Sequence, residues 1–99
     1  MGFINRFSSK NTIQCAHILV NTKKEAESVL NRVKQGEEFS KIANRVSRCP
    51  SSKKGGNLGR FGKGKMVKEF EDAAFALQKG EVSPIVKTQF GYHIIKRLK

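Results

Sequence analysis

The chain has 99 residues, a length typical of one small domain. Its 37% hydrophobic and 28% charged residues are ordinary for a folded soluble domain and exclude an intrinsically disordered chain. No apolar run approaches the roughly 18 residues of a membrane-spanning helix, and the first residues contain no signal-peptide core, so we expect an intracellular, cytoplasmic protein.

The charge is strongly positive, because 20 Lys and Arg residues against 8 Asp and Glu residues give a formal net charge of +12. No acidic residue lies between Glu38 and Glu69, where nine basic residues occur. A surface of this sign attracts nucleic acid, anionic membranes or acidic proteins. The basic residues within 41–68 are therefore a candidate contact with a polyanion, and a solvated basic surface without a partner is an equally good interpretation.

The N-terminal part predicts a tail and then a strand. Residues 1–11 are polar and basic, and we expect a flexible tail ahead of a domain formed by residues 12–99. Ile13–Val20 is apolar and rich in β-branched residues, which predicts a strand. Because side chains alternate between the two faces of a strand, one face is expected to carry Ile13, Cys15, His17 and Leu19.

Two amphipathic helices are predicted next. Thr22 and Glu25 match a capping box, and apolar residues follow at helical spacing until Gly36, a plausible C-terminal stop. The same spacing recurs from Phe39 to Val46, and Pro50 is expected to help end this second helix.

The C-terminal half predicts a glycine-rich loop, a third helix and a hairpin. A short strand is expected at 57–61 within the loop, and Phe70 to Leu77 has helical spacing. Residues 82–88 and 92–98 read as strands joined by 89–91, with an edge or bulge at Pro84. The order β-α-α-β-α-β-β predicts an α+β fold with an antiparallel sheet.

Three kinds of chemistry can be weighed from the residues. Gly59 to Lys65 has most of a phosphate-binding loop, but Met66 replaces the Ser or Thr that binds Mg²⁺, which argues against nucleotide binding. The cysteines and histidines do not have ordinary zinc spacing, and no third group orients a Cys–His nucleophile pair. Both cysteines are expected to be thiols. Histidines on buried strand faces are most often hydrogen-bonded core residues.

Four segments taken together resemble the parvulin family of peptidyl-prolyl cis/trans isomerases. The resemblance covers residues 13–99, in the right order and spacing, and indicates a small single-domain member. The segments are Ala16-His17-Ile18-Leu19-Val20, Gly55-Gly56-Asn57-Leu58-Gly59-Arg60-Phe61, Lys65-Met66-Val67-Lys68-Glu69-Phe70-Glu71-Asp72-Ala73-Ala74-Phe75 and Phe90-Gly91-Tyr92-His93-Ile94-Ile95. It implies a parvulin-like fold of the FKBP-like type, with a four-stranded antiparallel sheet and about four helices. The fourth helix would be a short turn within 51–54.

The resemblance also implies the site. Two histidines on adjacent strands, a cysteine facing the substrate amide and a hydroxyl bonded to the histidines would form its catalytic part. Apolar residues would hold the proline ring. The implied catalytic residues are His17, Cys49, Thr88 and His93, and the implied substrate-binding residues are Leu58, Met66, Phe70 and Phe90.

The implied activity is non-covalent isomerisation of X-Pro bonds in exposed or unfolded protein segments, as a folding helper. No cofactor or metal is implied, and a monomer is expected. Phosphate-directed parvulins carry a basic loop after the first strand, whereas here Val20-Asn21-Thr22 runs directly into the capped helix. We therefore expect no requirement for a phosphorylated residue before proline. The alternative is a basic module that binds nucleic acid or anionic membranes, with weak isomerase activity.

Overall fold

The structure, a computed structural model, describes residues 12–99; the tail predicted for residues 1–11 lies outside them. The predicted order of elements is confirmed, and the short fourth helix is a 3-10 turn. The elements are β1 (Thr12–Val20), α2 (Lys23–Lys34), α3 (Phe39–Val46), η1 (Pro50–Lys54), β2 (Asn57–Gly62), α4 (Lys68–Ala76), β3 (Val86–Thr88) and β4 (Gly91–Arg97). In this part of the chain no helix is long and apolar enough to cross a membrane.

The four strands form one antiparallel sheet in the order β2-β1-β4-β3, as the α+β prediction required. The long central pair is β1 with β4, in which His17 lies opposite Ile95 and Leu19 lies opposite His93. The pairing of β1 with β2 shifts register between Gln14 and Ala16. The central pair therefore brings both histidines to neighbouring strands.

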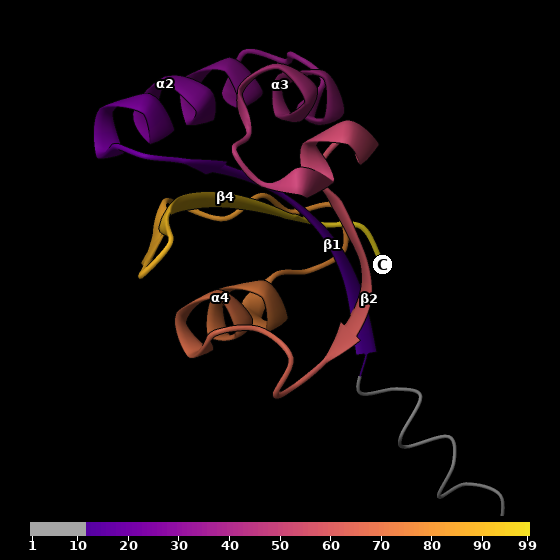
Figure 1. Cartoon of the computed structure of the whole chain (residues 1–99). Coiled ribbons are helices and arrows are strands. Elements are labelled where there is room, and N and C mark those ends of the chain that lie inside the picture. Colours follow the sequence, from indigo (N-terminus) through magenta and orange to yellow (C-terminus); the bar gives the residue numbers. More distant parts are fainter. Residues whose placement is uncertain (1–11) are drawn as a thin grey trace, which may run out of the picture.

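Helices cover both faces of this sheet (Figure 1). The helices α2 and α3 pack on one face around Ile18 and Ile94, which are fully buried. The helix α4 packs on the other face, where Phe70 meets Ile13, Cys15 and Ile95. The period of two predicted from the sequence explains this division, because alternate residues of β1 enter the two cores.

Local hydrogen bonds set how the chain leaves each element. The predicted capping box is present: the Thr22 hydroxyl accepts from the Glu25 N–H at 3.1 Å, and the Glu25 carboxylate accepts from the Thr22 N–H at 3.0 Å. Pro50 does not itself end α3, since the helix stops at Val46 and Pro50 begins η1. The Ser47 hydroxyl accepts from the Leu19 N–H at 3.0 Å, which ties the segment before Cys49 to β1.

The strand predicted over residues 82–88 is interrupted. Val82 makes a single bridge to Lys96, and regular pairing resumes only at Val86. The Ser83 hydroxyl accepts from the Ile95 N–H at 2.9 Å and donates to the Pro84 carbonyl at 2.7 Å. A side-chain oxygen thus takes the place of a backbone acceptor beside Pro84, which has no N–H of its own to add to the ladder.

Candidate active site

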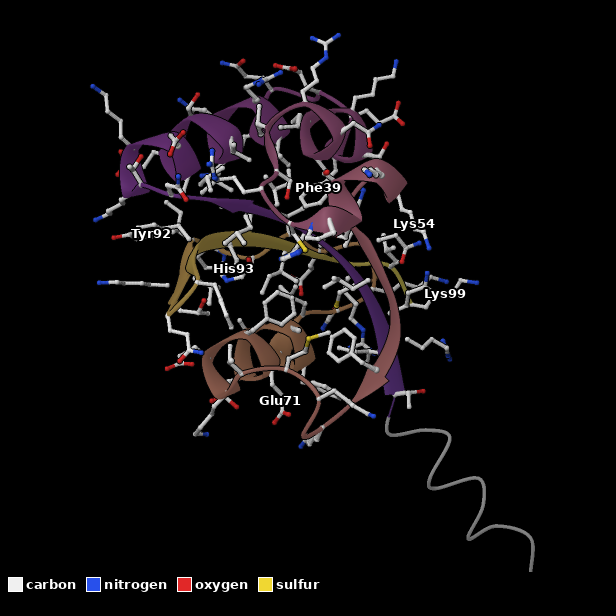
Figure 2. All side chains as sticks on the ribbon, viewed as in Figure 1. Phe39, Lys54, Glu71, Tyr92, His93 and Lys99 are labelled. Carbon is white, nitrogen blue, oxygen red and sulfur yellow. The ribbon has the colours of Figure 1, made fainter. Side chains whose placement is uncertain are left out.

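A cavity of about 450 Å³ opens between the sheet, α4 and the segment around Cys49. Seven of the eight predicted site residues line it, and the eighth, Thr88, is hydrogen-bonded to His93. The lining residues are His17, Leu19, Arg48, Cys49, Pro50, Leu58, Lys65, Met66, Val67, Phe70, Phe90 and His93. Figure 2 shows His93 between the sheet and α4. The fold thus brings together residues that lie up to 76 positions apart in the chain.

The two histidines form a hydrogen-bonded pair. Their Nδ1 atoms lie 3.0 Å apart, and their rings stack at an angle of 21°. The Thr88 hydroxyl lies 2.7 Å from Nε2 of His93 and accepts a hydrogen bond from the Phe90 N–H at 3.1 Å. A chain of polar groups therefore runs from the β3–β4 turn through Thr88 and His93 to His17.

Hydrogen-bond accounting favours one arrangement of protons in this chain. If the Thr88 hydroxyl donates to Nε2 of His93, then Nδ1 of His93 carries a proton and donates to Nδ1 of His17. The opposite arrangement would leave the Thr88 hydroxyl hydrogen without an acceptor. In the favoured arrangement Nε2 of His17 is protonated; it is buried and has no hydrogen-bond partner among residues 12–99.

Burial keeps both rings neutral. It lowers the pKa of His17 from 6.5 to about 4, and the neighbouring His93 adds to this effect. Burial also lowers the pKa of His93. A neutral pair shares one Nδ1 proton without electrostatic repulsion, so the geometry and the protonation state agree.

Stability is expected to fall as the pH falls from 7 to 5. Because the pKa of His17 is lower in the folded protein, only the unfolded chain takes up this proton in that interval. The free energy of unfolding should therefore decrease by about 2 kcal/mol for His17 alone, measured by urea unfolding at pH 7, 6 and 5. NMR titration of the ring protons is the independent check. A His17 ring that titrates near pH 6.5 would contradict this prediction.

The other side of the cavity is apolar. Phe70 is 3% exposed, and its ring meets His17 and His93 edge-on with centroids 5.5 and 5.3 Å away. Leu58 and Met66 are half-buried and pack against the same core cluster. Phe90, which is 60% exposed, stands at the cavity mouth. A small apolar ring can therefore be enclosed beside neutral polar groups.

The two cysteines differ in their surroundings. Both are free thiols, as predicted. Cys15 is fully buried outside the cavity, and burial raises the pKa of its thiol to about 11. Cys49 is half-buried and lines the cavity, but no hydrogen bond joins its thiol to either histidine within residues 12–99. The same residues contain no cluster of three or more His, Cys, Asp or Glu side chains placed to hold a metal ion.

Five of the lining residues were not among the site residues that the resemblance implied. Leu19 follows His17 by two positions on β1, so the strand period signals it. Arg48 and Pro50 flank Cys49 in the chain, and Lys65 and Val67 flank Met66. Sequence neighbourhood was thus an available signal for four of them. Their common position at one cavity was visible only in the fold.

An α+β fold with a histidine pair under an apolar cavity defines the class of protein. The model of the PPIC-type PPIase domain, or rotamase, matches residues 12–99, and the chain belongs to this family of peptidyl-prolyl isomerases. The resemblance to parvulins is thereby confirmed.

Individual relatives agree with this assignment. The chain is similar to NmPin, the parvulin of Nitrosopumilus maritimus, with 56% identity and a TM-score of 0.81 over 90% of this chain and 97% of that one. It is similar to PrsA from Bacillus subtilis, with 46% identity and a TM-score of 0.90 over 98% of this chain and 38% of that one. The foldase protein PrsA of Geobacillus sp. (strain WCH70) is 53% identical over 88 residues, which are 88% of this chain and 32% of that protein. The chain spans about a third of these curated foldases.

Proposed function

We propose that this chain accelerates cis/trans isomerisation of X-Pro bonds in exposed or unfolded protein segments, and so acts as a folding helper. The observation that carries the proposal is the apolar cavity of Leu58, Met66 and Phe70 beside a neutral histidine pair. Its volume of about 450 Å³ is ample for a proline ring and the adjoining peptide bond.

The physics of the reaction suits such a cavity. Rotation about a peptide bond has a barrier of about 18–20 kcal/mol, because the amide loses resonance when it twists. The twisted amide has less charge separation than the planar one. An apolar, water-poor cavity therefore disfavours the planar form relative to the transition state. No covalent bond needs to form, and the mechanism requires no nucleophile, cofactor or metal.

Each wall of the cavity then has a role. Leu58, Met66 and Phe70 hold the proline ring, so that the remainder of the chain rotates relative to it. Cys49 contacts the substrate amide as its carbonyl turns, either as a weak thiol donor or as a thiolate. The histidines and Thr88 brace the opposite wall through the hydrogen bonds at 3.0 and 2.7 Å. Phe90 extends the apolar surface at the mouth.

We propose further that phosphate is not required before the proline. The segment after β1 is the short Asn21-Thr22 connection, in which Thr22 is occupied by capping α2. No basic loop is inserted there. The proposed substrate is therefore recognised through the proline cavity.

Replacing Met66 with Ala is expected to reduce kcat/KM by about tenfold, since it removes a methylene, a sulfur and a methyl group, and burying one methylene contributes about 0.8 kcal/mol. The measurement is NMR exchange spectroscopy on unphosphorylated Ala-Xaa-Pro peptides. Val33→Ala is the matched control, because Val33 belongs to α2 and packs against the core on the opposite face of the sheet. Wild-type protein that folds but does not speed exchange would refute the proposed function. Equal activity of the Met66 and Val33 variants would place the proline elsewhere.

Three expectations stay predictions: contact of residues 41–68 with a polyanion, a monomeric state and a cytoplasmic location. The relatives described above are named as a parvulin, as PrsA and as a foldase protein, and none of the three is named for nucleic-acid or membrane binding. Polyanion binding should weaken as salt is added and should be the same for the wild-type protein and the Met66→Ala variant.

A further inference from the structure

The proline cavity continues into a second one. This neighbour, of about 440 Å³, shares Cys49, Pro50 and Leu58 with the proline cavity and runs along η1. The two cavities together form one extended groove. A peptide whose proline occupies the first cavity can therefore lay its flanking residues along the second.

Cations line the extended groove. Arg48 and Lys65 belong to the first cavity, and Lys53 and Lys54 belong to the second. Figure 2 shows Lys54 at the outer edge of the molecule, beside η1. None of the chain's 8 acidic residues lines either cavity. The groove thus has positive side chains along its length and no carboxylate to balance them.

Within residues 12–99 these four cations have no ion-pair partner. Across residues 12–99, ion pairs join Arg32 to Glu37 and Lys68 to Asp72, and none involves a groove residue. The histidine pair contributes no charge at neutral pH, because burial lowers both pKa values. The positive potential of the groove is consequently left for a bound peptide.

We propose that the extended groove selects X-Pro segments that carry Asp or Glu within a few residues of the proline. Arg48 and Lys65 would attract a carboxylate next to the proline. Lys53 and Lys54 would attract a carboxylate that lies further along the peptide. This inference rests on the proposed isomerase function and specifies its substrate class. Because all four side chains are exposed, the expected gain is modest, about threefold in kcat/KM for each carboxylate.

The test compares peptides that differ only in charge. Ala, Glu and Lys are placed in turn beside the proline and, in a second set of peptides, a few residues away from it, and isomerisation is measured by NMR exchange. The expected order of kcat/KM is Glu, then Ala, then Lys. The differences should disappear near 1 M salt, where the screening length is about 3 Å.

Charge-matched variants separate the groove from the protein's overall field. Arg48→Gln with Lys65→Gln should remove the preference for Glu beside the proline. Lys34→Gln with Lys79→Gln lowers the net charge equally, but neither residue lines the groove, so the preference should persist. Lys53→Gln with Lys54→Gln should affect only carboxylates placed further from the proline.

Each negative outcome of these experiments has a distinct interpretation. Equal rates on Ala and Glu peptides, with isomerisation intact, overturn the inference and leave the proposed function standing. The inference is also overturned if the Arg48/Lys65 and Lys34/Lys79 variants lose the preference for Glu equally, because the long-range field of the protein would then account for it. No acceleration of any peptide refutes the proposed function itself. A phosphoserine peptide should gain about tenfold, roughly the square of the Glu gain, and a gain of several hundredfold would reveal a dedicated phosphate site.

Discussion

Replacing Gly56 with Ala is expected to destabilise the protein by about 3 kcal/mol and to disrupt the active site. Gly56 has φ of +85°, and a Cβ atom there would clash with the His17 carbonyl oxygen. Its own carbonyl accepts a hydrogen bond from the His17 N–H at 3.0 Å. The added methyl group must therefore push β1 away at the residue that forms half of the histidine pair.

A matched glycine separates this contact from backbone strain. Gly36 has φ of +97°, and a Cβ atom there would meet nothing within 4 Å. Gly36→Ala should therefore cost only the strain of a positive φ, about 1 kcal/mol. Urea unfolding of both variants gives the comparison. Equal losses of stability would show that the close approach to His17 does not matter.

Replacing Phe70 with Ala is expected to damage both stability and activity. The side chain is 3% exposed and contacts Phe61 as well as both histidines, with ring centroids 6.2, 5.5 and 5.3 Å away. Its removal should lower the free energy of unfolding by about 3–5 kcal/mol. Since the ring also forms a cavity wall, kcat/KM should fall by about a hundredfold, measured where the variant is still folded.

Phe75 on the same helix is the control. It meets Phe61 at 6.1 Å but does not line the cavity. Phe75→Ala should lower the free energy of unfolding while leaving kcat/KM unchanged. Phe70→Leu should be much more stable than Phe70→Ala but little more active. An inactive Phe75 variant would mean that activity reports core integrity alone.

The sequence by itself predicted most of the elements, because their signals are local. The capping box of Thr22 and Glu25 placed the start of α2, and the period of two placed His17 on one face of β1. The strand predicted over residues 82–88 was right in part: β3 lies at the sheet edge, as Pro84 indicated, but it begins only at Val86. The strand pattern does not show that the Ser83 hydroxyl takes the place of a backbone acceptor for the Ile95 N–H. Hydrogen bonds formed with another strand leave no local trace in composition.

The active site likewise has features that the sequence predicted and features that only the tertiary structure showed. The resemblance to parvulins implied every predicted site residue by its position in the chain, and seven of the eight line one cavity. Only the tertiary structure decided that His17 and His93 meet through Nδ1, that burial holds them neutral, and that the groove continues past Cys49 between unpaired cations. Periodicity and motif depend on near neighbours in the chain. Proton sharing, burial and surface charge depend on distances between segments that only the packed sheet brings together.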